Sequence, residues 1–195
     1  MPEMARHEGV LCRSGAWSWA ARRIVLPWAL QGVELAGEVL EIGAGGGAMA
    51  AEIAARFPAV RLTATDVDEA MVAAARGRLA PLGERARALQ ADSAALPFDE
   101  GAFDAVLAFL MLHHVGQWEQ ALSEAARVLR PGGVLLGYDV LDKPIVRALH
   151  GFRTAHGERF PTFAELDLEL SILPFKNVWI RPGAGSVARF RATRR

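Results

Sequence analysis

Three acidic residues and a run of glycines are the residues of this 195-residue chain whose types and spacing point to chemistry. An apolar stretch ends in Glu41, and glycines then recur at every second position from Gly43 to Gly47. Glycine is needed where a backbone turns sharply or touches a ligand without a Cβ in the way. Asp66 and Asp92 follow the next two apolar stretches. This pattern predicts a nucleotide-binding site built on a strand, a tight turn and a helix.

Apolar runs of strand length alternate with helical patterns along most of the sequence, and this alternation decides where those residues lie. The acids and glycines follow the carboxyl ends of predicted strands, which is the edge where open α/β sheets bind ligands. An α/β fold with a doubly wound, mostly parallel sheet is therefore expected. One strand enters the glycine loop, further strands are predicted at 60–66, 86–91, 103–109 and 134–138, and helices at 48–57, 71–79 and 118–129.

Both ends of the chain depart from this alternation. Two short β-like runs, 177–181 and 186–191, flank a turn rich in proline and glycine and predict a C-terminal antiparallel hairpin. Residues 16–31 predict an amphipathic helix ahead of the sheet. We expect a single globular unit in which a helical lid segment at 1–36 precedes the main domain at 37–195.

Composition and charge exclude several classes of protein. Lysine and arginine together number 22, as do aspartate and glutamate, so no global field favours nucleic acid or an anionic membrane. The longest uninterrupted apolar run, 105–112, is far too short to span a bilayer. The single Cys12 cannot form an internal disulfide, which fits a reducing compartment. We expect a cytoplasmic protein with no nucleic-acid partner and no stable membrane insertion.

Two nucleotide ligands fit the glycine loop. The run from Gly43 to Ala48 satisfies the dinucleotide fingerprint, and Asp66 follows at roughly the ~20 residues expected of a ribose-binding acid, so an NAD(P)-dependent oxidoreductase is one alternative. Against it, Glu41 would place a second negative charge beside an anionic pyrophosphate, whereas a ligand with an ammonium and a sulfonium would be attracted. Tyr138 also has no lysine four positions on, as a short-chain dehydrogenase pair would require. The residues favour the sulfonium ligand.

An ordered series of short motifs, from about residue 37 to the C-terminus, resembles the class I S-adenosylmethionine-dependent methyltransferases. More narrowly, it is similar to their small-molecule branch, which includes ubiquinone and menaquinone methyltransferases. The resemblance implies a Rossmann-like, seven-stranded sheet in which the last hairpin inserts one antiparallel strand. Each motif is weak alone, and their order makes the resemblance specific. The motifs lie at 41–47 (Glu-Ile-Gly-Ala-Gly-Gly-Gly), 65–67 (Thr-Asp-Val), 92–98 (Asp-Ser-Ala-Ala-Leu-Pro-Phe), 103–106 (Phe-Asp-Ala-Val), 112–115 (Leu-His-His-Val) and 127–133 (Arg-Val-Leu-Arg-Pro-Gly-Gly).

The resemblance also implies the contacts to S-adenosyl-L-methionine, with S-adenosyl-L-homocysteine as the product. Asp66 would accept hydrogen bonds from the ribose hydroxyls, Asp92 from the adenine amino group, and Glu41 would support the ammonium. Asp66 and Asp92 each have a competing local role, as the N-cap of a helix and the cap of a turn. The implied cofactor-binding residues are Glu41, Gly43, Ala44, Gly45, Gly47, Asp66, Val67, Asp92, Ser93 and Phe109, the last of them near the reactive methyl.

Catalytic residues are harder to assign, because methyl transfer from a sulfonium needs alignment more than acid–base chemistry. His113 and His114 follow the fourth strand, while Tyr138 and Asp139 end the fifth and are expected to face the same crevice. No metal is expected, since no Asp, Glu or His cluster has metal-ligand spacing. We expect a small-molecule acceptor under a roof made by the N-terminal helix and residues 143–163, with a homodimer possible. A non-catalytic, methyltransferase-like partner protein is the second alternative.

Overall fold

The computed structural model describes residues 21–30, 32–142, 160–183 and 186–195. The lid segment up to residue 20, with Cys12, lies outside the described residues, as does 143–159 of the expected roof. Predictions on those segments stay predictions.

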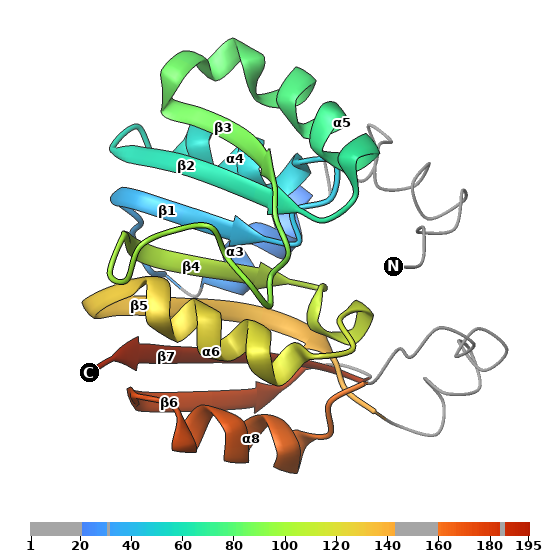
Figure 1. The fold of residues 1–195 in the computed structure, drawn as a ribbon, viewed down its shortest axis with the longest axis vertical. Helices are drawn as coiled ribbons and strands as arrows, with labels where there is room; N and C mark the ends of the chain where they lie inside the picture. The colour runs from blue at the N-terminus through green and yellow to red at the C-terminus, as the bar shows by residue number, and fades with distance from the viewer. Residues whose placement is uncertain (1–20, 31, 143–159, 184–185) are drawn as a thin grey trace, which may run out of the picture.

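A single mixed sheet forms the centre of the protein (Figure 1). It has seven strands in the order β3-β2-β1-β4-β5-β7-β6. All neighbours pair in parallel except β7, which is antiparallel to both β5 and β6, so the predicted mostly parallel sheet with one inserted antiparallel strand is confirmed. The strands are β1 Gly37–Ile42, β2 Val60–Asp66, β3 Ala86–Gln90, β4 Phe103–Phe109, β5 Leu129–Val140, β6 Phe175–Pro182 and β7 Val187–Arg194.

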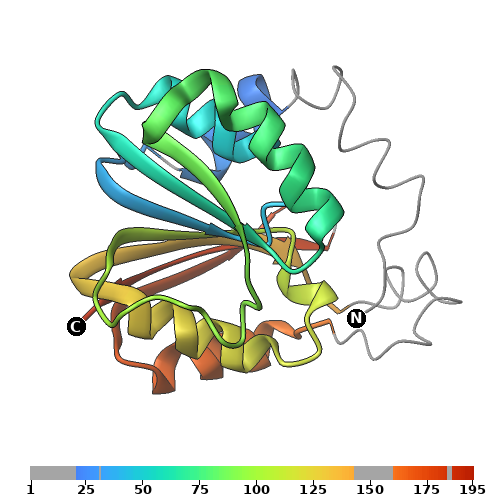
Figure 2. The ribbon, with the colours of Figure 1, turned by 45° about the horizontal axis from the view of Figure 1, so that its top comes forward.

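Helices cover both faces of the sheet, as the doubly wound prediction requires (Figure 2). One layer holds α3, α4 and α5, and the other holds α6 and α8. Each face has its own apolar core, because successive residues of a strand point to opposite faces. The helices are α3 Leu26–Leu30, α4 Ala48–Arg56, α5 Glu69–Leu79, α6 Trp118–Val128 and α8 Phe163–Ile172, with a π-helical turn η1 Ala21–Val25 and 3-10 turns η2 Ala80–Arg85 and η3 Leu112–His114.

Three elements differ from the sequence-based expectation. The helix predicted at 16–31 is described only from residue 21, as η1 followed by the short α3. Strand β5 begins at Leu129 and not at 134, because Leu129 already pairs with Phe103 ahead of a register shift. The sequence patterns do not predict α8, because its apolar residues include the exposed Leu168 and Ile172 and so do not form one buried stripe.

Candidate active site

The parallel strands end at one edge of the sheet, and this edge brings most of the predicted site residues together. In the strand registers Ile42 of β1 lies between Thr65 of β2 and Ala108 of β4. The next residues along these strands are therefore the glycine loop and Asp66. Phe109 of β4 pairs in turn with Tyr138 of β5. The topology thus places the loop between the acid of β2 and the aromatic end of β4.

The glycine loop adopts backbone conformations that other residues rarely take. Gly43 and Gly45 have φ of 63° and 53°. A Cβ on Gly43 would lie 2.5 Å from the Cβ of Met111, so this glycine is needed for packing under the loop. A Cβ on Gly45 would meet nothing within 4 Å, so its positive φ leaves an open face of backbone at the edge of the sheet.

Asp66 closes the loop through its carboxylate. Its Oδ2 accepts a 2.7 Å hydrogen bond from the Gly45 amide and its Oδ1 a 3.0 Å bond from the Asp68 amide. The N-cap of α5 is Asp68, which accepts from the Ala70 amide, so the competing role as the helix cap does not fall to Asp66. An ionised carboxylate offers about four acceptor positions, and two remain for a ligand.

Glu41 is a buried acid that has no counter-ion among the residues described. Only 2% of its surface is exposed, and its Oε2 has no hydrogen-bond partner within the described part of the chain. Burial, and to a smaller extent the neighbouring Asp66 carboxylate, raises the pKa of Glu41 to about 8. Removing a carboxylate from water is costly unless a cation or donors compensate, so this position suits a positively charged group.

The third acid lies beyond the end of β3 and is exposed. Asp92 Oδ1 accepts from the Ala94 amide at 2.9 Å, which is the turn-capping role that competes with ligand binding. Ser93 beside it is buried, whereas Val67, next to Asp66, is 37% exposed and open to contact. Ala44 stands within the loop, its amide bonded to the Thr65 carbonyl.

Aromatic side chains occupy the edge beyond the loop. Phe109 stacks on Tyr138 with ring centroids 5.3 Å apart, and Trp28 of α3 meets the edge of the Tyr138 ring at 5.2 Å. The backbone turns sharply just after Phe109, where Leu110 has a φ of 53°. Such a strained non-glycine residue is uncommon and often lies at a functional site.

The four candidate catalytic side chains do not face one crevice. Tyr138 points into the core that contains α3, while Asp139, the next residue, points to the opposite face. There the Asp139 carboxylate is fully buried and contacts His113 Nδ1 at 2.5 Å, and its two oxygens also accept from the Leu112 and Val140 amides. His114 is exposed. The expectation of a shared crevice is wrong because residues alternate along a strand.

Two residues at this edge are missing from the sequence-based site. Arg189 of β7 pairs with Tyr138, and its Nη1 donates to the Trp28 carbonyl at 2.8 Å across a separation of 161 residues. The Arg189 guanidinium lies 4.6 Å from the Trp28 ring centroid. No short sequence motif predicts this contact, because it depends on the position of β7 beside β5 in the sheet.

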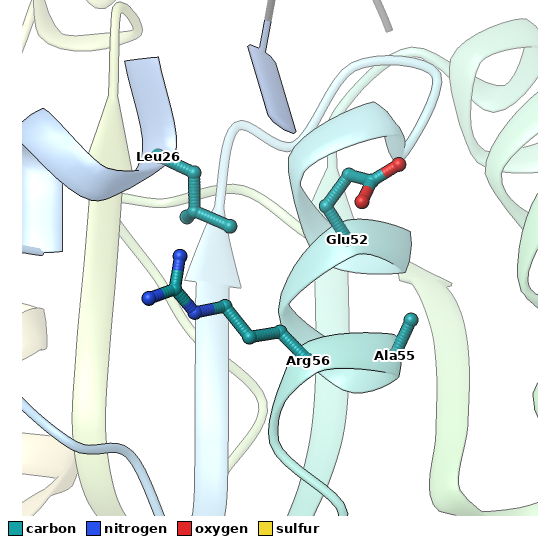
Figure 3. A pocket seen from close by; sticks show the side chains of 4 residues that line it. All are labelled: Leu26, Glu52, Ala55 and Arg56. Atoms are coloured by element: carbon teal, nitrogen blue, oxygen red, sulfur yellow. The ribbon is translucent and has the colours of Figure 1, made fainter. Parts of the chain in front are cut away.

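A pocket of about 280 Å³ lies between α3 and α4, on the face of the sheet that these helices cover (Figure 3). Leu26, Glu52, Ala55 and Arg56 line it, and Arg56 ends α4, far along the helix from the glycine loop. The described ranges hold no group of three or more His, Cys, Asp or Glu residues able to bind a metal. No helix among them is long and apolar enough to cross a membrane.

Comparison with known proteins gives consistent matches. Residues 39–133 match the protein family described as Methyltransferase domain. Demethylmenaquinone methyltransferase of Thermus thermophilus is 37% identical over 116 residues, which cover 57% of this chain and 53% of that protein. Malonyl-[acyl-carrier protein] O-methyltransferase of Geobacter sulfurreducens is 36% identical over 104 residues, which cover 53% of this chain and 38% of that protein. The chain spans about half the length of the first of these relatives.

The fold has close counterparts among solved structures. One is the complex between the Haloferax volcanii Trm112 methyltransferase activator and a putative methyltransferase. One chain of that complex superposes on this protein with a TM-score of 0.77 at 17% identity. The match covers 98% of this chain and 99% of that one. At this identity the likeness shows a shared fold.

Proposed function

We propose that this chain, which carries a class I S-adenosylmethionine-dependent methyltransferase domain, transfers a methyl group from that cofactor to a small-molecule acceptor. The observation that carries the proposal is the pair of Glu41 and Asp66 beside the open backbone of Gly45. We take 37–195 as the methyltransferase unit and 1–36 as its lid.

The residues at the edge fit the parts of this cofactor. The uncompensated Glu41 suits the ammonium, the two remaining acceptor positions of Asp66 suit the ribose hydroxyls, and exposed Val67 suits the adenine face. Asp92 and the Ser93 amide would take the adenine edge. Phe109 ends β4 between this half of the edge and Tyr138, which is where an acceptor would meet the methyl.

The cofactor supplies a methyl group activated by its bond to a positively charged sulfur, so the protein has to align the acceptor and exclude water. A base is required only for an acceptor that arrives protonated. We assign no base here, because the contact of His113 with Asp139 holds the imidazole on the face of the sheet opposite to Phe109 and Tyr138, where the acceptor is placed.

Isothermal titration calorimetry tests the cofactor directly. S-adenosylhomocysteine should bind with a micromolar dissociation constant, and NADH should give no binding heat. NADH binding without S-adenosylhomocysteine binding would overturn the proposal in favour of the oxidoreductase alternative. Binding of S-adenosylhomocysteine without turnover of any acceptor in a panel of phenols, amines and thiols would favour the non-catalytic alternative.

A further inference from the structure

A row of four side chains crosses the carboxyl edge on the face that carries α3. Phe109 pairs with Tyr138, Tyr138 with Arg189, and Arg189 with Arg181 of β6. Directly paired residues point to the same face of a sheet. Neighbouring strands lie about 4.8 Å apart, so the Arg189 backbone is roughly 10 Å from that of Phe109. The row therefore leads from the proposed transfer centre to two adjacent guanidinium groups.

These two arginines have no carboxylate partner among the described residues. None of the ion pairs formed within the described residues involves Arg181 or Arg189. Arg189 Nε is buried and has no acceptor in the described part of the structure. Like charges placed directly opposite each other in an antiparallel pair are destabilising. Because the chain as a whole has a net charge of zero, two uncompensated neighbouring arginines are a local feature that an anion would relieve.

Aromatic rings hold the pair in place. The Arg189 guanidinium contacts the rings of both Trp28 and Trp179, at 4.6 and 5.6 Å from their centroids. The Arg181 guanidinium lies 5.1 Å from the Trp179 ring. Stacking restricts the rotamers of a long side chain before a ligand arrives, and the planar guanidinium then offers paired donors to an oxyanion. Arg181 is exposed and provides the access.

We infer that Arg181 and Arg189 bind an oxyanion, a carboxylate or a phosphate, on the methyl acceptor. The part of this inference that identifies the bound molecule as the methyl acceptor rests on the proposed function. The anion site itself is tested separately. The inference makes the acceptor an anionic molecule whose charged group lies roughly two strand spacings, about 10 Å, from the methylated atom.

The test is binding of three aromatic probes of similar size: benzoate, phenyl phosphate and the uncharged benzamide. Each is titrated into the free protein and into protein saturated with S-adenosylhomocysteine, with the indole NMR signals of Trp28 and Trp179 as the readout. At least one of the two anions should bind ten times more tightly than benzamide and shift both indole signals. Benzoate and phenyl phosphate distinguish a carboxylate from a phosphate site.

Variants assign the site to the arginines. Arg181→Gln, at an exposed position, should weaken the preferred anion at least fivefold, and Arg181→Lys should restore part of the loss. Arg61→Gln removes the same charge from an exposed position on β2 and should have no effect. Equal affinity for anions and benzamide, or equal losses in the Arg181 and Arg61 variants, would overturn the inference. Absence of S-adenosylhomocysteine binding would count against the proposed function alone, because the titrations of free protein still report on the anion site.

Discussion

The two halves of the carboxyl edge carry opposite charge and are assembled differently. The half formed by β1, β2 and β3 presents the acids Glu41, Asp66 and Asp92, each at or just beyond the end of its strand. The half formed by β5, β7 and β6 presents Arg181 and Arg189 in contact with tryptophan rings. Consecutive parallel strands bring the acids together, whereas the arginines meet only because β7 runs antiparallel between β5 and β6. One edge can therefore hold a cationic cofactor and an anionic acceptor side by side.

The largest expected effect is on the pH dependence of stability in the acidic half. Between pH 4.5 and 8 the folded protein keeps the Glu41 proton that the unfolded chain loses. The free energy of unfolding should therefore fall as pH rises through this window, by at most about 1.4 kcal/mol per pH unit and about 5 kcal/mol in all. Glu41→Gln should remove this component. In urea unfolding at pH 5, 6, 7 and 8, the free energy of unfolding of the variant relative to that of the wild type should therefore increase with pH. Parallel pH profiles would contradict the raised pKa.

Asp139→Ala tests the other half. This change leaves the buried Leu112 amide and the part-buried Val140 amide without their acceptor and removes the contact partner of His113, which should cost about 3–5 kcal/mol of unfolding free energy. Asp139→Asn, which keeps one oxygen, should cost less. Affinity of the folded protein for S-adenosylhomocysteine should stay within twofold. A large loss of cofactor affinity would show that the two halves are not independent.

Asp66→Ala should weaken the binding of S-adenosylhomocysteine about 100-fold, because it removes the acceptor of the two charge-assisted hydrogen bonds that we propose to the ribose. Asp68→Ala is the matched control, two residues along the chain. It removes the N-cap of α5 and should cost about 1 kcal/mol of stability without a change in affinity. Calorimetry and urea unfolding on both variants separate the two roles. Unchanged affinity in Asp66→Ala would remove this acid from the cofactor site.

The smallest effect is expected at the start of α8. Thr162 and Glu165 form a reciprocal capping box there. Thr162→Ala should lower the free energy of unfolding by about 1 kcal/mol. The affinity of the protein for S-adenosylhomocysteine and for the anionic probes should not change. A change in probe binding would mean that α8 supports the basic half of the edge.

Prediction from sequence succeeds where a structure depends on neighbouring residues. The strand of Val60–Asp66 and the helix that follows the glycine loop have local apolar patterns, and the observed bounds agree closely with the expected ones. The apolar pattern does not predict α8, although the capping box at Thr162 could have indicated where this helix begins. The shared crevice expected for Tyr138 and Asp139 fails for a local reason, because consecutive residues of a strand point to opposite faces of the sheet.

The sequence by itself determined the acidic half of the site and the class of fold, because both depend on turns, glycines and alternating apolar runs that act over a few residues. Only the tertiary structure decided the partners of Asp139 and Arg189. The contact of Asp139 with His113 spans 26 residues, and that of Arg189 with Trp28 spans 161. Such contacts depend on strand order and register, which no short segment encodes.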